Sequence, residues 1–244
     1  MISHAWRCIF VHQRKSAGTS VKAMFPDATG ADRGRFNEGV LEPHWDEDDP
    51  TIRAYLKFTV IRNPWDRFIS GWKHCRSTKH RSVLDVLENL PRESLLSNVL
   101  DPRTSAPARW HYGREILRQA KDRTKYTVRT ALGREDDTPQ RPGHEYRHVT
   151  RQQVQTVVYP DGRLAMDRVV FFEELDAGLS EVCRLLGKPW RKPPALRVRR
   201  AGDDYRRHFD DRSLAAFARA FGRDIEYWGY DFDTGLPDWP RRQT

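Results

Sequence analysis

The sequence predicts an α/β protein, a three-layer sandwich in which helices flank a central parallel sheet. Two short apolar runs, residues 8–12 and 57–61, each end in a polar turn that leads into apolar residues at helical spacing. A third run, residues 166–172, precedes a helical pattern over residues 177–186. Strands that alternate with helices favour parallel pairing, because each helix carries the chain back to the end of the sheet where the previous strand began.

Local signals place the other helices. One is expected over residues 19–24, after the first strand, and another follows from the apolar spacing of residues 65–72. A short helix over residues 82–90 is indicated by Ser82, a residue type that caps helix N-termini. The last helix is predicted over residues 213–228 from an apolar stripe at helical spacing.

Two further segments complete the prediction. Residues 155–159 form an apolar run separated from the third strand by the turn signal Pro160-Asp161-Gly162, so we interpret the run as a strand. Residues 133–148 almost lack apolar side chains, which predicts a polar surface loop or lid.

Length and composition predict a single domain over residues 1–244. Hydrophobic residues make up 38% of the 244, which is enough for one sizeable core. The chain carries 43 Lys and Arg against 34 Asp and Glu, a net charge of +9, and this favours an anionic partner. Nucleic acid, an acidic lipid surface and a phosphorylated cofactor all fit that charge. The sequence does not set the oligomeric state.

Several classes of protein are disfavoured. The three cysteines, Cys8, Cys75 and Cys183, form no CxxC pair, so neither a zinc site nor a disulfide framework is expected. No carboxylate pair matches a magnesium site, and we predict no metal. No stretch approaches the roughly 20 apolar residues that span a bilayer. We therefore expect no transmembrane segment and a soluble, cytoplasmic protein.

The turn after the first strand is the first candidate site. It brings a basic side chain, hydroxyls and backbone N–H groups to the start of a helix, where they favour an anion. The residues concerned are Lys15, Ser16, Gly18, Thr19 and Ser20. The order differs from a Walker A loop, since Lys15 precedes Gly18, and ATP hydrolysis is therefore disfavoured.

Residues 10–20, FVHQRKSAGTS, resemble the 5′-phosphosulfate loop, FxHxPKxAGTS, of sulfotransferases that depend on 3′-phosphoadenosine 5′-phosphosulfate (PAPS), in their type 2, carbohydrate-acting branch. Arg14 stands where proline is usual. The resemblance implies that Lys15 contacts the bridging oxygen and the leaving 5′-phosphate. It also implies a P-loop-like fold and a cofactor-binding loop made by Arg14, Lys15, Ser16, Ala17, Gly18, Thr19 and Ser20.

A second segment, FTVIRNPWDRFISGW at residues 58–72, resembles the 3′-phosphate motif of the same family, FxFVRNPxDRxxSxY. It implies that Arg62 and Ser70 bind the 3′-phosphate, and that Arg67 pairs with the body of the protein. Weaker agreement continues through residues 167–175 and 205–230, in the family's order.

The resemblance implies transfer of a sulfuryl group from PAPS to a hydroxyl of a sugar or small-molecule acceptor, with adenosine 3′,5′-bisphosphate as product. The resemblance also implies His44 as the general base, because this branch of the family often has a histidine in the loop before the 3′-phosphate strand. An unperturbed imidazole pKa of about 6.5 suits proton abstraction at neutral pH. The alternatives for the base are Glu42, Asp46 and Glu47. Arg199 or Arg200 is expected over the 3′-phosphate, and His148 beside the acceptor.

Two other functions remain open. A P-loop kinase or nucleotide hydrolase shares the strand-loop-helix pattern, but the GK[ST] order is missing. A non-catalytic nucleic-acid-binding protein would use the positive charge, but no DNA-binding or RNA-binding module is recognisable, so we expect no nucleic-acid partner.

Overall fold

The computed structural model describes residues 1–29, 50–76, 78–91, 99, 100, 102, 104, 106–131, 146–159, 161–194 and 204–239. The chain falls into two compact units. The first comprises Met1–Arg67, Gln152–Arg207 and Phe221–Thr244. The second comprises Phe68–Arg151 and His208–Ala220. The single domain expected from the sequence stays a prediction.

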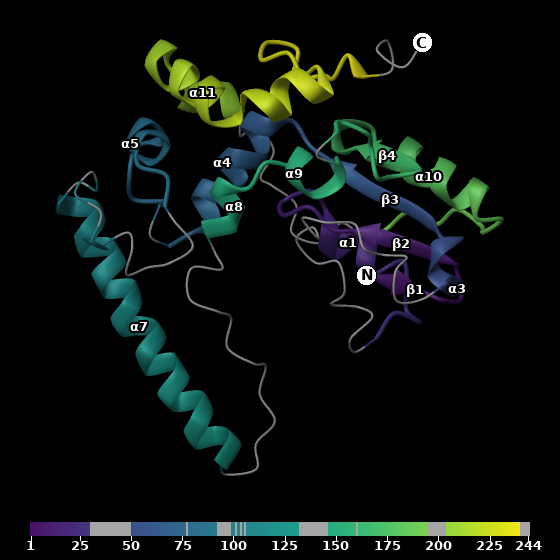
Figure 1. Ribbon diagram of the computed structural model, residues 1–244, viewed down its shortest axis with the longest axis horizontal. Helices are drawn as coiled ribbons and strands as arrows, with labels where there is room; N and C mark the ends of the chain where they lie inside the picture. Colours follow the sequence, from purple (N-terminus) through teal and green to yellow (C-terminus); the bar gives the residue numbers. More distant parts are fainter. Residues whose placement is uncertain are drawn as a thin grey trace. The chain divides into compact units, whose positions relative to one another are not determined.

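The first unit contains a four-stranded sheet in the order β1 (Ile2–Ser3), β2 (Cys8–Val11), β3 (Leu56–Ile61) and β4 (Arg168–Phe171) (Figure 1). The strands β2, β3 and β4 pair in parallel, as the sequence predicts, whereas β1 pairs antiparallel with β2. The α/β class is confirmed, and the sheet is mixed. The P-loop-like sandwich stays a prediction.

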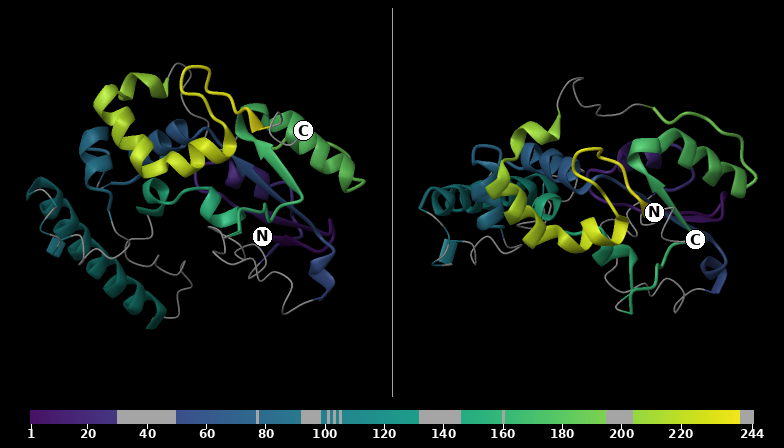
Figure 2. Two further views of the ribbon diagram at one scale, coloured as in Figure 1. Left: turned by 45° about the horizontal axis from the view of Figure 1, so that its top comes forward. Right: turned by 90° about the horizontal axis from the view of Figure 1, so that it is seen from above.

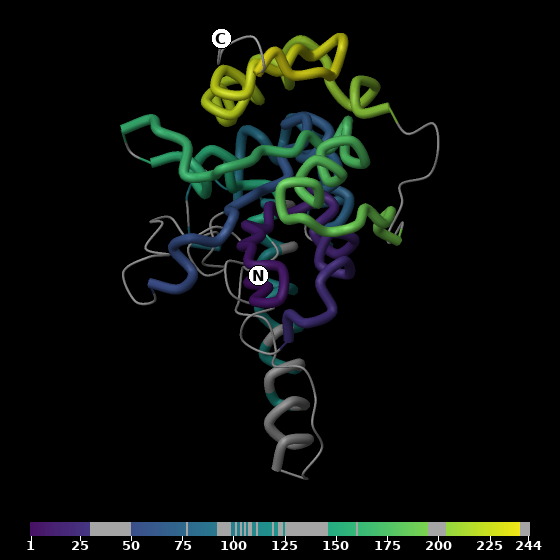
Figure 3. The backbone as a smooth tube through the Cα atoms, turned by 90° about the vertical axis from the view of Figure 1, so that its right-hand side faces the viewer, coloured from purple at the N-terminus to yellow at the C-terminus, as the bar shows by residue number. Residues whose placement is uncertain are grey.

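The edge strand β1 was not predicted, because two residues carry no hydrophobic period. A tight turn joins it to β2 (Figure 3), and within it the N–H of Arg7 donates to the carbonyl of His4 at 3.2 Å. Arg7 has a φ of 51°. The edge strand is thus a short hairpin partner of β2.

The helices of the first unit lie between and after these strands. They are α1 (Gly18–Lys22), α3 (Pro50–Arg53), α9 (Val154–Val157), the 3-10 helix η2 (Phe172–Glu174) and α10 (Leu175–Leu185). Three further helices have residues in both units: α4 (Pro64–His74), η3 (Tyr205–His208) and α11 (Asp211–Trp228).

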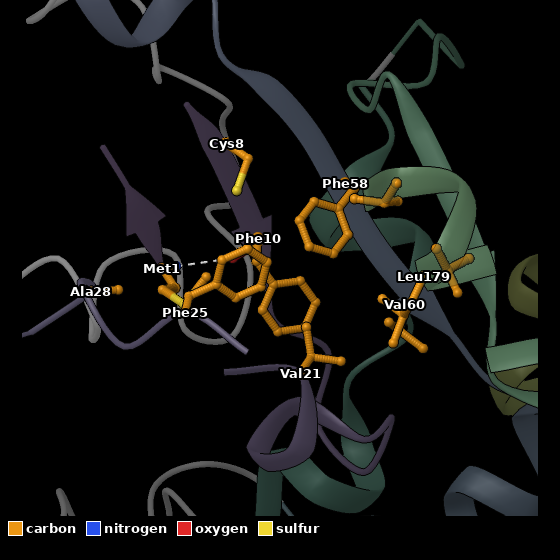
Figure 4. Close-up of a cluster of buried hydrophobic side chains, with 11 residues drawn as sticks. Met1, Cys8, Phe10, Val21, Phe25, Ala28, Phe58, Val60 and Leu179 are labelled. Carbon is orange, nitrogen blue, oxygen red and sulfur yellow. Dashed lines mark hydrogen bonds between the residues drawn. The ribbon is translucent and has the colours of Figure 1, made fainter. Parts of the chain in front are cut away.

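The core of the first unit covers one face of the sheet (Figure 4). Phe10 of β2 and Phe58 of β3 stack with their ring centroids 5.1 Å apart. Val21 of α1 and Leu179 of α10 belong to the same buried cluster. Both helices therefore pack on this face, and their apolar side chains stabilise it by removing carbon surface from water.

Helix α10 lies alongside β4 (Figures 1 and 2). The approach is close, because a Cβ atom on Gly178 would lie 2.6 Å from a side-chain carbon of Val170. The helix ends where Gly187 adopts a φ of 62° and the N–H of Lys188 donates to the carbonyl of Cys183 at 2.9 Å. This is the Schellman ending that the glycine favours.

The opposite side of β4 faces the end of α11. The rings of Phe171 and Trp228 pack edge to face, with centroids 6.5 Å apart, and Trp228 is fully buried. The helix ends before Gly229, whose φ of 67° suits a glycine. The predicted last helix is thus confirmed, and it begins at Asp211, two residues earlier than expected.

The strand predicted over residues 155–159 is wrong, because Val154–Val157 form helix α9. The two carboxylate oxygens of Asp224 accept hydrogen bonds from the N–H groups of Gln153 and Val154, each at 2.8 Å. This tertiary cap satisfies donors that a helix start leaves open. It outweighs the strand preference of the run QTVV.

The second unit contains α5 (Val83–Glu88), α7 (Ala106–Ala131) and α8 (Arg147–Thr150). The prediction for α5 is confirmed, since the Ser82 side chain accepts the N–H of Asp85 at 3.1 Å. Helix α7 was not predicted from the sequence. Within this unit Arg81 donates to the hydroxyl of Tyr112 at 2.9 Å.

None of the described helices combines the length and the apolar character that crossing a bilayer requires. The three cysteines are buried as free thiols. Burial raises the pKa of the Cys8 thiol to about 12, which favours its neutral form.

Candidate functional site

The loop after β2 presents backbone N–H groups to one side. Lys15 and Ala17 adopt left-handed conformations, with φ of 66° and 55°, and Ser16 between them does not. Such alternation turns successive N–H groups inward and forms an anion-binding concavity. Within the described part of the chain, the N–H groups of Ala17, Gly18 and Thr19 make no hydrogen bond. They are therefore available to an anion.

Gly18 is required by the close approach of a histidine. A Cβ atom on Gly18 would lie 1.9 Å from two atoms of the His12 imidazole. Any larger residue would collide with the ring or displace it. His12 is half-buried directly after β2.

Arg62 lies directly after β3 and reaches the loop after β2. Its Nη1 atom donates to the backbone carbonyl of Lys15 at 2.7 Å, and its Nε atom donates to a carboxylate oxygen of Asp66 at 2.7 Å. The guanidinium carbon lies 4.3 Å from the centroid of the Phe172 ring. The structure therefore brings Lys15 and Arg62 together, and it holds the Arg62 side chain in one orientation with 7% of its surface exposed.

The turn that follows Arg62 is held by the half-buried carboxylate of Glu173. The N–H of Asn63 donates to one oxygen of Glu173 at 2.8 Å, and the hydroxyl of Tyr230 donates to the other at 2.8 Å. Burial raises the pKa of Glu173 despite these bonds, and burial also raises the pKa of Tyr230. Glu173 thus links the end of β3 to the segment after α11.

Arg67 pairs with the body of the protein, as the resemblance implies. Its guanidinium lies 3.8 Å from the carboxylate of Asp224, and both side chains are buried. Burial lowers the pKa of Arg67 and raises that of Asp224, while their mutual attraction opposes both shifts. Arg67 therefore has a structural role, since its guanidinium forms a buried ion pair with Asp224.

Two predicted site residues belong to the second unit. Ser70 is half-buried on α4, eight residues after Arg62. His148 lies on α8, with its ring centroid 4.6 Å from that of His74. The polar loop predicted over residues 133–148 is wrong at its end, because Arg147 and His148 are helical.

The remaining predicted site residues lie outside the described residues. They are the general base His44, its alternatives Glu42, Asp46 and Glu47, and the late basic residues Arg199 and Arg200. The lid prediction for residues 133–145 also falls outside them. Among the residues that are described, no group of three His, Cys, Asp or Glu side chains is arranged to hold a metal ion.

One residue that touches both loops was not predicted from the sequence. Gln153 hydrogen-bonds to Arg62 and to Ser16, and it is fully buried. No local signal distinguishes it from the neighbouring Gln152 and Gln155 in the run RQQVQ. Its contacts depend on packing between segments far apart in the chain.

Comparison with known proteins agrees with the two motifs. A family model, that of the Sulfotransferase family, matches the sequence over residues 2–189. This range is more than half of the chain, and it contains β1 to β4 and both candidate loops. Neither the curated proteins nor the solved structures gave a match. The chain belongs to the sulfotransferase family.

Proposed function

We propose that this protein is a PAPS-dependent sulfotransferase that moves a sulfuryl group to a hydroxyl of a sugar or small-molecule acceptor. Membership of the family indicates sulfuryl transfer in general. The hydrogen bond between Arg62 and the Lys15 carbonyl is the observation that supports the donor nucleotide most directly. It joins the ends of two parallel strands, and ligands of parallel sheets bind at such ends.

The loop after β2 fits the 5′ end of the donor. Three N–H groups without a bond in the described chain, those of Ala17, Gly18 and Thr19, are suited to phosphate or sulfate oxygens. Gly18 leaves the approach open, because it has no Cβ atom. We propose that Arg14, Lys15, Ser16 and Ser20 complete this subsite, with the ammonium group of Lys15 providing the positive charge.

Arg62 is our proposed ligand for the 3′-phosphate. A guanidinium has five N–H donors, and the bonds to Asp66 and to Lys15 occupy only part of them. Asp66 also fixes the plane of the group, so that the donors left over have a defined direction. Ser70, on the helix that follows, would supply a hydroxyl to the same phosphate, and Arg199 or Arg200 would add charge.

When bound, PAPS would supply a sulfuryl group whose sulfur–oxygen bond to the 5′-phosphate breaks as a bond to the acceptor oxygen forms. Lys15 stabilises negative charge that develops on the leaving phosphate. His44 takes the proton of the acceptor hydroxyl, with Glu42, Asp46 or Glu47 as the alternative base. We propose that His148 contacts the acceptor, and that the chain acts as one sulfotransferase domain.

Titration calorimetry with nucleotides tests the donor. We expect adenosine 3′,5′-bisphosphate to bind more tightly than ATP, because the two subsites are built for phosphates at the 3′ and 5′ positions. Tighter binding of ATP would favour a P-loop kinase or nucleotide hydrolase. Tight binding of a polynucleotide with a steep salt dependence would favour a nucleic-acid-binding protein. Incubation with labelled PAPS and a panel of sugar and small-molecule hydroxyls would then identify the acceptor.

A further inference from the structure

The side chain of Gln153 pairs with the backbone of Arg62 in the way that a neighbouring strand would. Its Oε1 atom accepts the N–H of Arg62 at 3.0 Å, and its Nε2 atom donates to the carbonyl of Arg62 at 2.9 Å. Arg62 is the first residue after β3. The carboxamide thus extends the hydrogen bonding of the strand by one residue and fixes the backbone from which the guanidinium extends.

The same carboxamide also reaches the other loop. Its Oε1 atom accepts the hydroxyl of Ser16 at 3.4 Å. Ser16 and Gln153 are fully buried, and Arg62 is 7% exposed. In such a place an unmade hydrogen bond is costly, since water cannot replace it. Both lone pairs of Oε1 are therefore committed, one to each of the candidate phosphate loops.

The backbone of Gln153 is held independently of its side chain. Its N–H donates to the buried Asp224, which pairs with Arg67, and its carbonyl accepts the hydroxyl of Thr156 at 2.7 Å. Thr156 in turn accepts a hydrogen bond from the side chain of Gln13, in the loop after β2. A network of this kind resists displacement of any one member. The carboxamide is therefore a fixed point against which both loops are placed.

We propose that Gln153 is a positioning residue that sets the spacing between the 5′-phosphate loop and Arg62, so that one nucleotide with two phosphates can bind both. The inference rests on the proposed function. The relevant ligands are adenosine nucleotides with phosphate at both the 3′ and 5′ positions. When two linked groups bind one rigid receptor, the second contact adds affinity only if the spacing of the receptor matches that of the ligand.

The test compares two nucleotides on the full-length protein. Calorimetry gives the Kd of adenosine 5′-monophosphate, which offers one phosphate, and of adenosine 3′,5′-bisphosphate, which offers two. The Kd of the monophosphate divided by the Kd of the bisphosphate measures how much affinity the second phosphate adds. We expect Gln153→Met, which keeps the volume and removes the hydrogen bonds, to lower this ratio at least about tenfold and to change the monophosphate Kd less than about threefold.

The matched control is Gln155→Ala, on helix α9, which begins directly after Gln153. Among the described residues, the Gln155 side chain hydrogen-bonds only to the backbone N–H of Gln152, which it accepts at 3.3 Å. It bonds to neither candidate loop, so we expect the ratio of the variant to equal that of the wild type. Gln153→Glu keeps the acceptor and loses the donor, and it should give a ratio between wild type and Gln153→Met. If Gln153 were merely structural, Gln153→Met would weaken the binding of both nucleotides by the same factor and leave the ratio of their Kd values unchanged.

Failure of the proposed function and failure of the inference about Gln153 give different results. A wild-type ratio near one contradicts the proposed function itself. A large wild-type ratio that Gln153→Met preserves overturns the inference alone. Should neither variant fold, hydrogen exchange of the wild-type Gln153 side-chain amide decides the matter by NMR. We expect protection in the free protein that increases with the bisphosphate, whereas exchange at the solvent rate in both states overturns the inference.

Discussion

The Nη1 atom of Arg62 donates a 2.7 Å hydrogen bond to the backbone carbonyl of Lys15. The two residues are 47 positions apart in the chain. They meet because β2 and β3 are parallel neighbours, with Val11 paired to Thr59 close to the ends of both strands. The hydroxyl of Thr59 strengthens the junction by donating to the carbonyl of Val11 at 2.8 Å. The loops that follow β2 and β3 therefore lie side by side.

Lys15→Ala should abolish sulfuryl transfer. The lysine is the proposed source of positive charge at the leaving phosphate, and removal of one such group costs about 100-fold or more in kcat. Steady-state kinetics with saturating PAPS measures the loss. The control is Lys192→Ala, since Lys192 is exposed and pairs with Asp176 at the surface. Turnover near that of wild type in Lys15→Ala would contradict the assignment.

Arg62→Ala should act mainly on binding. A hydrogen bond to a charged group contributes about 1.5–3 kcal/mol, so we expect the Kd of adenosine 3′,5′-bisphosphate to rise about 10-fold to 100-fold. The kcat at saturating PAPS should fall much less. Calorimetry and kinetics on the same preparation separate the two effects. The assignment fails if kcat collapses while nucleotide affinity is unchanged.

Gly18→Ala should destabilise the protein, because the new Cβ atom would lie 1.9 Å from the His12 ring. Overpacking of this kind costs about 1–3 kcal/mol, and it should also weaken nucleotide binding. Gly113→Ala is the matched control on α7, where a Cβ atom meets nothing within 4 Å. That change should stabilise the helix by about 0.5–1 kcal/mol.

Denaturant unfolding of both glycine variants measures these effects. A second variant that combines Gly18→Ala with His12→Ala tests the cause directly, because removal of the imidazole relieves the collision. We expect the double variant to lose less stability than the two single variants predict when added. Strict additivity would show that His12 is not the obstacle.

Glu173 should make stability depend on pH. Burial raises its pKa above the ordinary value of 4.5, so the folded protein holds this proton more tightly than the unfolded chain does. The contribution of Glu173 to stability is complete below pH 4.5 and is lost as the pH rises through the raised pKa. Glu173→Gln cannot titrate and should lack this loss.

The measurement is the free energy of unfolding at several pH values for wild type and Glu173→Gln. We expect the wild-type value, relative to that of the variant, to fall as the pH rises above about 4.5. A difference that stays flat, or that grows with pH, would indicate that the hydrogen bonds from Asn63 and Tyr230 outweigh burial.

The strands of the sheet were largely predictable from the sequence. The strands β2, β3 and β4 are apolar runs closed by turns, and α10 and α11 carry both an apolar stripe and a glycine ending. Helix α9 was mistaken for a strand, because its start depends on Asp224, a residue far along the chain. Local pattern cannot represent such a contact.

At the candidate site too, residues in local motifs were predicted, and a residue that depends on distant contacts was not. Lys15 and Arg62 stand in short motifs whose residues are adjacent in sequence, and these motifs predicted that the two residues share a ligand. Gln153 has no such motif. It bonds to Arg62 across 91 positions and to Ser16 across 137. The residues that carry charge were therefore predicted, and the neutral side chain that joins their loops was not.

A crystal structure of the protein with adenosine 3′,5′-bisphosphate tests the central claim most directly. We expect the 5′-phosphate within about 3 Å of the N–H groups of Ala17, Gly18 and Thr19, and the 3′-phosphate at a similar distance from the Arg62 guanidinium. A nucleotide bound elsewhere, or with only one phosphate near these two loops, would contradict the account.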